Sequence, residues 1–332
     1  MGRISKTAIT MGLMIALGGP AASQGLPDFD SFMIVPAGGG TAVSAVQAAN
    51  ALKDYDVIFV GELHDHIAGH LAEMALLRAL QARAPKIALS MEQFERDVQP
   101  VVDDYLAGKI GEETLKTKGR AWSNYAEAYR PLVEFAKDHA LAVIAANAPE
   151  SVVRCVAQQG ADFLATLSAD KRGWAAAELH TEDGPYKQKY LAFLSGDPAH
   201  GEAPGAGTAA AAAEKSYAAQ VTRDDTMAES IANYLRANPG DKLVHVTGAF
   251  HVEAGLGTIE RLKMRAPNLN IALVLPVETD NPQAVMTADN GADFAILLRP
   301  EPEAYVSDEE RKAAEDREAK SIRAATRGRC KL

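Results

Sequence analysis

The stretch that decides the fold is residues 56–66, with the letters DVIFVGELHDH. Its first part, residues 56–60, places four β-branched or aromatic residues directly before a glycine. Such a run is typical of a short strand that is buried on both faces. From residue 65 to residue 83, alanine and leucine recur at helical spacing until Pro85. A buried strand followed by a helix is the unit from which parallel sheets are built.

The same alternation recurs on both sides of this stretch. Residues 24–50 are rich in Pro, Gly and Ala, and we expect them to be irregular apart from a short helix near residues 43–53. The pattern predicts an α/β fold, with a mostly parallel sheet flanked by helices. We expect the strands at residues 56–60, 87–91, 141–146, 243–247, 271–275 and 294–298.

Residues 161–238 interrupt the alternation and contain no convincing strand. They include a Pro/Gly/Ala-rich loop and then five consecutive alanines at residues 209–213. This segment predicts a smaller, all-helical insertion domain. The α/β core then comprises residues 24–160 and 239–300, and a charged C-terminal tail occupies residues 301–332.

The first 23 residues have the pattern of a secretory signal peptide. Arg3 and Lys6 precede an apolar run at residues 8–17, and Ala21 and Ser23 are small residues before a cleavage site after Ser23. The apolar run is shorter than the ~20 residues that span a membrane. No cysteine lies near the cut, so we expect a periplasmic or secreted protein that is not a lipoprotein.

Composition excludes several classes of protein. The 332 residues carry 34 basic and 44 acidic side chains, a net charge of −10, and the basic footprint of a nucleic-acid binder is missing. Two cysteines, Cys155 and Cys330, cannot build a disulfide framework or a cysteine zinc site. Nothing in the sequence places these two residues together, so their pairing stays open.

A cluster of possible ligands follows the first predicted strand. Glu62 and His64 are two residues apart and share a face if the backbone stays extended. His66 and His70 are four residues apart and share one face of the next helix. Ligands bind at the carboxyl ends of strands in open α/β sheets, so the cluster indicates a functional site. The alternative is a helix cap at Asp65 beside solvated histidines.

Other polar residues fall at the same edge of the predicted sheet. Glu92 follows the second strand and Asn147 the third, although a helix N-terminus also favours such residues. His251 follows the strand at 243–247 in the letters GAFH, which repeat the G-x-x-H spacing of GELH. His245, inside that strand, is interpreted as a buried core histidine.

Histidine and carboxylate ligands suit zinc, manganese or iron. His64, Glu92 and His251 are therefore the candidate metal ligands, and Glu62 is the candidate general base of a metal-dependent hydrolase acting on peptides or esters. Under this hypothesis all four residues are catalytic.

The sequence resembles the ChaN-like haem-binding uptake proteins, which belong to the wider Tiki/TraB and erythromycin-esterase-like superfamily. The resemblance covers roughly residues 50–275, and it is weak in the helical block. The matching segments are GELHDHIAGHLAEMALLRAL, SMEQFERDVQPVVDDYLAG, YRPLVEFAKDHALAVIAANAPESVVR, DDTMAESIANYL and VTGAFHVEAGLGTIERL.

The resemblance implies haem binding linked to iron acquisition in the bacterial envelope, with envelope haem-transport components and a second copy of the chain as expected partners. It implies a tyrosine as iron ligand. Tyr125 and Tyr129 lie in the matching stretch, whereas Tyr186, Tyr190 and Tyr217 lie in the divergent block. The other candidate haem-binding residues are His66, His70, Arg130 and Arg154, the arginines as partners of the propionates.

We therefore expect an exported haem-binding protein of iron uptake. A metal-dependent hydrolase is the alternative function, and a degenerate site on a partner-binding scaffold is a third. Haem, or another small molecule, is the expected ligand, and a divalent metal ion is the alternative cofactor.

Overall fold

The computed structural model describes residues 26–84, 86–195, 207–281, 291–314, 316–317, 330 and 332. Its seven strands form one sheet in the order β1-β7-β6-β2-β5-β3-β4. Neighbouring strands are parallel except for β1, which pairs with β7 in the antiparallel sense. The strands are β1 (Phe32–Pro36), β2 (Val57–Glu62), β3 (Ile87–Glu95), β4 (Val143–Asn147), β5 (Lys242–Gly248), β6 (Ile271–Glu278) and β7 (Phe294–Leu298).

The α/β fold with a mostly parallel sheet is confirmed, and all six predicted strands are present. Two boundaries matter for the site: β2 extends through Glu62, and β3 continues to Glu95, so Glu92 lies inside a strand. The prediction of an irregular segment at residues 24–50 was wrong for β1. This strand is a five-residue edge strand that ends at Pro36, and proline is tolerated at a sheet edge.

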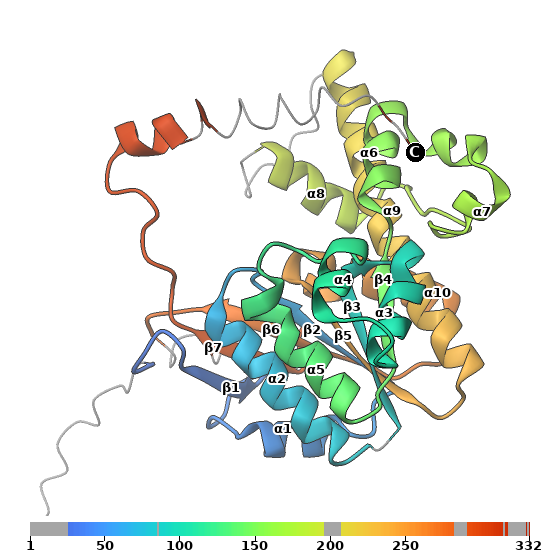
Figure 1. Ribbon diagram of the computed structural model, residues 1–332. Helices are drawn as coiled ribbons and strands as arrows, with labels where there is room; N and C mark the ends of the chain where they lie inside the picture. The colour runs from blue at the N-terminus through green and yellow to red at the C-terminus, as the bar shows by residue number, and fades with distance from the viewer. Residues whose placement is uncertain are drawn as a thin grey trace, which may run out of the picture.

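Helices cover both faces of the sheet and also form a separate layer beyond one end of it (Figure 1). Short 3₁₀ or π turns, η1 to η5, connect several of them. The helices are α1 (Ala45–Leu52), α2 (Ile67–Gln81), α3 (Gln99–Leu106), α4 (Glu112–Lys118), α5 (Arg130–Asp138), α6 (Glu150–Gln159), α7 (Ala169–Arg172), α8 (Pro185–Ser195), α9 (Thr208–Ala237) and α10 (Thr258–Arg265).

Strand β2 shows how the core is divided between the two faces. Ile58 and Val60 pack in the cluster that contains the apolar residues of α1, α2 and α5. Val57 and Phe59 point to the opposite face and pack with residues of α9 and α10. All four side chains are fully buried, which is why this strand is a continuous apolar run and does not alternate.

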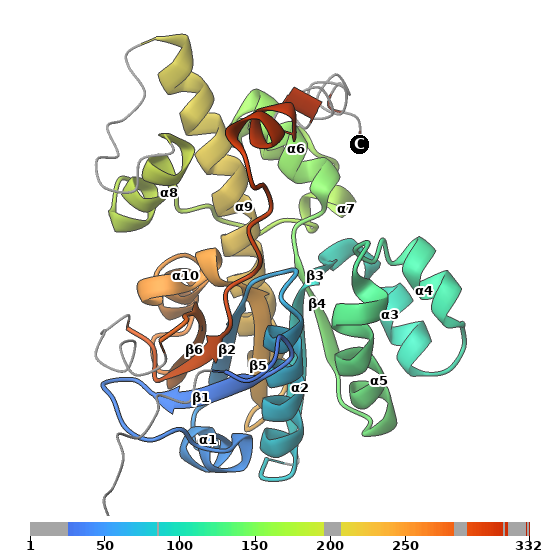
Figure 2. The ribbon, with the colours of Figure 1, turned by 90° about the vertical axis from the view of Figure 1, so that its left-hand side faces the viewer.

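Helix α9 joins the sheet to the helical layer (Figure 2). Its first half packs through Tyr217 and Val221 against α8, and through Ala218 and Ala219 against α6. Its second half, from Met227 onward, lies on the sheet. The end of the predicted insertion 161–238 therefore belongs to the sheet layer, and α6, which precedes it, packs with the helical layer. Residues 196–206 of the predicted loop at 196–207, and the predicted signal peptide, lie outside the described residues.

The chain returns to the helical layer after β7. Cys330 forms a disulfide with Cys155 of α6, and its backbone N–H donates to Gln158. This pairing, which the sequence left open, attaches the end of the charged tail to the helical layer. Among the described residues, no helix is both long and apolar enough to cross a membrane.

Candidate functional site

The adjacent strands β2, β5 and β3 carry the central residues of the site at their carboxyl ends. Glu62 is the last residue of β2, and His64 follows two positions later. Glu92 lies in β3, and Gly248 ends β5 just before the short turn that carries His251. The parallel register thus brings together side chains that are far apart in the sequence, from Glu62 and His64 to Glu92 and His251.

Glu62 is buried and orients His64. One carboxylate oxygen, Oε1, accepts hydrogen bonds from His64 Nδ1 at 2.6 Å, Gln93 Nε2 at 2.7 Å and the Tyr129 hydroxyl at 2.9 Å. With its proton on Nδ1, the His64 ring keeps the Nε2 lone pair free for a ligand. Burial lowers the pKa of His64, but the hydrogen bond to Glu62 and the charges of Glu92 and Glu62 outweigh it and raise this pKa.

Glu92 is held on the neighbouring strand. Its Oε2 accepts from the Thr247 hydroxyl at 2.6 Å and from the Gly248 backbone N–H at 2.7 Å. Its Oε1 lies 3.4 Å from His251 Nε2. Burial alone would raise the pKa of Glu92, but the charge and hydrogen bond of His251 hold it well below its usual value. Glu92 is thus a stable buried carboxylate.

His251 is oriented by Asp224, a residue that the sequence analysis did not single out. Asp224 is fully buried in α9, and its Oδ1 accepts from His251 Nδ1 at 2.7 Å and from Thr258 at 2.9 Å. Its Oδ2 accepts from the Tyr186 hydroxyl at 2.7 Å. Burial lowers the pKa of His251, but the charges of Glu92 and Asp224 outweigh it and raise this pKa to about 10.

Gly248 lies next to both the His64 ring and the Glu92 carboxylate. A Cβ atom at this position would lie 2.7 Å from His64 Nε2 and 3.7 Å from Glu92 Oε2. Its φ of −52° suits any residue, so the glycine is required by space alone. The first G-x-x-H motif differs, because a Cβ at Gly61 would meet Leu275 at 2.8 Å in the core.

His70 and Glu73 of α2 form a second buried cluster with Glu62. His70 Nδ1 lies 3.2 Å from Glu73 Oε2 and 3.7 Å from Glu62 Oε2. Burial lowers the pKa of His70, but the hydrogen bond and charge of Glu73 raise it to about 9. Burial and the charge of Glu62 raise the pKa of Glu73 to about 7.

This second cluster, and not the predicted trio, has metal-ligand spacing. Within the described parts of the chain, Glu62, His70 and Glu73 have ligand atoms within 4.8 Å of one another. His64, Glu92 and His251 do not form such a group among those residues. Glu92 accepts from Thr247 and Gly248 through Oε2, and His251 donates to Asp224 from Nδ1.

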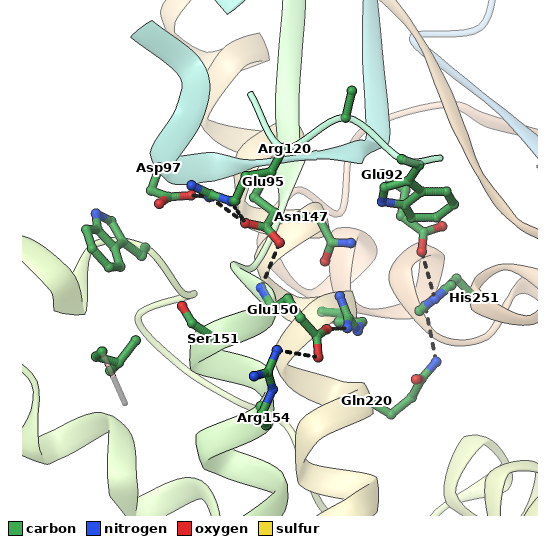
Figure 3. A pocket seen from close by; sticks show the side chains of 15 residues that line it. Glu92, Glu95, Asp97, Arg120, Asn147, Glu150, Ser151, Arg154, Gln220 and His251 are labelled. Atoms are coloured by element: carbon green, nitrogen blue, oxygen red, sulfur yellow. Dashed lines mark hydrogen bonds and ion pairs between the residues drawn. The ribbon is translucent and has the colours of Figure 1, made fainter. Parts of the chain in front are cut away.

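Two cavities meet at His251 and Gln220, which line both. The first has a volume of about 690 Å³ and an aromatic wall of Tyr190, Phe193 and Phe250 beside His64. The second, of about 900 Å³, is polar and extends from Glu92 to Arg154 of α6. Figure 3 shows His251 between Glu92 and Gln220 on one side of the larger cavity. Asn147, which also lines this cavity, is the last residue of β4 and precedes α6.

The predicted haem-binding tyrosines lie inside the protein. Tyr129 is fully buried with its hydroxyl on Glu62, and Tyr125 is buried against Phe94. Burial and nearby negative charge raise the pKa of both phenols well above the usual value. Tyr186, Tyr190 and Tyr217 are buried as well.

Of the other predicted haem contacts, His66 lines the 690 Å³ cavity together with His64, whereas the two arginines lie elsewhere. His66 is buried at the start of α2, where Nε2 bonds to the Arg299 carbonyl and the ring stacks on Phe29. Arg130 forms an ion pair with Glu112 and lines neither of the two cavities. Arg154 lines the larger cavity and lies 3.7 Å from Glu150.

The pKa of His251 predicts a loss of stability in alkaline solution. A histidine whose folded pKa is raised stabilises the fold below its unfolded pKa of ~6.5, and this contribution is lost as pH rises through the folded value of about 10. We expect the free energy of unfolding to fall between pH 7 and pH 10. His70 acts in the same direction.

Urea unfolding at several pH values checks this prediction. Asp224→Asn serves as the matched variant, because loss of the carboxylate charge should lower the pKa of His251 and flatten the alkaline fall. His245 has the opposite effect, because burial lowers its pKa to about 3. The stability that neutral His245 contributes is therefore lost as the pH falls from 6.5 toward 3. Equal free energies of unfolding at pH 7 and pH 10 in the wild type would contradict the assignment.

The fold and the site define an α/β protein with buried, carboxylate-oriented histidines at the strand ends. The family model "Haem-binding uptake, Tiki superfamily, ChaN" matches residues 48–262, and the chain belongs to this family. A curated relative is the chloroplastic protein RETICULATA-RELATED 5 of Arabidopsis thaliana, 26% identical over 219 residues. That match covers 61% of this chain but 28% of the relative, so the chain spans just over a quarter of its length.

Two solved structures are similar to this chain, and the first of them has the same fold. One, described as cofacial haem binding to ChaN of Campylobacter jejuni, superposes with a TM-score of 0.57 at 14% identity, covering 81% of this chain and 97% of that one. A mutant of erythromycin esterase EreC in its open conformation gives a TM-score of 0.42 at 13% identity, covering 76% and 78%.

Proposed function

We propose that this protein binds haem in the 690 Å³ cavity, with His64 as the iron ligand. The observation that carries this proposal is the orientation of His64: its Nδ1 donates to Glu62, and its half-exposed ring lines the cavity. A carboxylate on the far nitrogen fixes the tautomer and strengthens a histidine ligand. Family membership and the haem bound by the C. jejuni protein support the same ligand.

The walls of this cavity suit a flat, apolar ring. Phe193 and Phe250 lie with ring centroids 5.2 Å apart, and Phe193 is 67% exposed. The volume falls within the ~300–1,000 Å³ of small-molecule sites. Lys189 lies beside this wall, with its ammonium 4.2 Å from the centre of the Phe250 ring and 2.9 Å from Glu253. Bound haem would supply an iron atom, which His64 would hold.

Titration with hemin tests this proposal. The wild type should show a saturable shift of the Soret band at one haem per chain. In His64→Ala the affinity should fall by about 100-fold, because the ligand is removed. His139→Ala is the matched control, since His139 is an exposed histidine at the end of α5. An unchanged Soret shift in His64→Ala would rule out His64 as the ligand.

The tyrosine alternative is tested in the same titration. Tyr129→Phe should alter the Soret band only slightly, because the Tyr129 hydroxyl binds Glu62 inside the protein. Tyr190→Phe examines the tyrosine that lines the cavity, although its hydroxyl already contacts Ser216 at 2.6 Å. If one of these variants erases the ligand band while His64→Ala keeps it, tyrosine ligation is correct and the histidine assignment is wrong.

We further propose that the protein is exported and handles haem for iron uptake in the cell envelope, with envelope haem-transport components as partners. The N-terminal sequence pattern and the Cys155–Cys330 disulfide support this location, because disulfides persist in oxidising compartments. Fractionation of the native host and sequencing of the mature N-terminus test it. A mature protein in the envelope fraction that begins at Gln24 is expected, and an uncut cytosolic chain would contradict the proposal.

Hydrolysis of an ester or a peptide is the second candidate function. The alignment of Asp224, His251 and Glu92, with contacts of 2.7 Å and 3.4 Å, favours it. The His251 imidazolium would donate a proton to the leaving group, and deprotonated His64 would accept one from the attacking water. With haem-free protein and nitrophenyl esters, His251→Asn should lower kcat/KM by at least about 100-fold. Turnover that His251→Asn leaves unchanged would exclude this role.

A further inference from the structure

We propose that Glu62, His70 and Glu73 form a buried binding site for one divalent transition-metal ion of the zinc and manganese type. Their ligand atoms lie within 4.8 Å of one another, and all three residues are buried. This site shares Glu62 with the proposed haem site, where Glu62 orients His64, and it uses a different set of residues from the trio that the sequence suggested.

Unsatisfied oxygens point to a cation at this place. Glu62 Oε2 and Glu73 Oε1 are buried atoms without a hydrogen-bond donor, although each residue is only 2% exposed. Buried carboxylate oxygens ordinarily have partners, and isolated buried negative charge is costly. Among the described residues, the ion-pair partners of these two carboxylates are His64 and His70, and no lysine or arginine pairs with either of them. A divalent cation between them would neutralise both charges.

His70 has the orientation of a metal ligand. Its Nε2 lies 3.0 Å from the His64 carbonyl, to which it donates, so Nδ1 is the nitrogen that faces Glu62 and Glu73. Histidines that bind metals commonly donate their other ring N–H to a backbone carbonyl or a carboxylate in this way. The helix also helps, because residues three apart lie on the same face and bring His70 and Glu73 together.

Glu62 likewise has one carboxylate oxygen available for a metal ion. Its Oε1 already accepts from His64, Gln93 and Tyr129, which leaves Oε2 toward His70. Two ligands at ~2.1 Å from one ion lie roughly 3–4 Å apart, so small side-chain rotations bring the three groups into coordination distance. One imidazole and two carboxylates suit zinc, manganese or ferrous iron. The ion would also fix Glu62, and through it His64.

Zinc binding to metal-free, haem-free protein tests the site. Competition against a chromophoric chelator should show one zinc ion per chain in the wild type. The dissociation constant should rise by at least about 10-fold in Glu73→Gln, which keeps the size of the side chain. Glu134→Gln is the matched control, because Glu134 is a partly buried carboxylate that binds Tyr105 in another part of the protein. It should bind zinc like the wild type.

The position of the ion is a second, independent measurement on the wild type, and it does not depend on the folding of a variant. Crystals grown with zinc should give one anomalous peak between Glu62, His70 and Glu73. Three outcomes would overturn the proposal: no stoichiometric zinc, a peak at His64 and His251, or equal affinity in Glu73→Gln and the wild type. In the last case a proton shared between the two carboxylates, not a metal ion, would explain their contact.

Discussion

Asp224→Ala is expected to lower the free energy of unfolding by about 3–5 kcal/mol, the cost of removing one partner from a buried ion pair. Asp224 is fully buried and accepts from His251, Thr258 and Tyr186. Without it, the imidazolium of His251 loses one of its two charge partners and keeps only Glu92, and two hydroxyl groups lose their acceptor. The substitution would therefore weaken the contacts between α9 and its neighbours at the point where the helical layer joins the sheet.

Chemical denaturation of the wild type and variant measures this effect. Asp170→Asn is a suitable control, because this exposed acid in α7 belongs to the same helical layer, and a change within ±0.5 kcal/mol is expected. Asp224→Asn keeps the shape of the side chain and removes its charge. It should lower the free energy of unfolding by less than Asp224→Ala does, and it should lower the pKa of His251 in an NMR titration. A loss below 1 kcal/mol in Asp224→Ala would show that His251 does not depend on this carboxylate.

Gly248→Ala is expected to displace the His64 ring and so prevent it from binding a ligand, while leaving the fold largely intact. The added Cβ would lie 2.7 Å from His64 Nε2 and 2.8 Å from Cε1, closer than a Cβ atom approaches a ring in real proteins. The backbone can accept alanine, so the imidazole must move and lose its hydrogen bond to Glu62. If His64 ligates iron, hemin affinity should fall by about 100-fold, as in His64→Ala.

Soret titration together with thermal unfolding checks this prediction. Gly173→Ala is the matched control, because a Cβ there would meet nothing closer than 3.6 Å. A Gly248→Ala protein that unfolds at the wild-type temperature but binds hemin weakly is the expected result. Wild-type affinity would show that hemin is not bound through His64 Nε2, and it would favour a site elsewhere in the cavity.

Much of the candidate site could be anticipated because strand ends are local features. The apolar run at 56–60 ends at a glycine, and the polar residues Glu62 and His64 follow it. The same reasoning found Glu92 and His251. It failed for β1, because five residues flanked by Pro and Gly resemble a loop until β7 is present to pair with them.

The partners of these residues could not be anticipated, because they come from segments distant in sequence. Asp224 lies in a helix that the sequence assigned to a separate insertion, and the letters DDTMAESIANYL do not say which acid faces inward. Glu73 looked like an ordinary helix residue, and its burial against Glu62 depends on how α2 packs on the sheet. The contact of the Tyr129 hydroxyl with Glu62 likewise depends on the tertiary structure.

The sequence by itself determined the α/β class, the order of six strands along the chain and the polar residues at the ends of those strands, since each depends on a short run of neighbouring residues. Only the tertiary structure decided which atom each residue contacts. Asp224 binds His251, Glu73 joins Glu62, and Cys155 pairs with Cys330. The physical reason is that burial and charge pairing depend on distances across the whole fold, which local sequence does not encode.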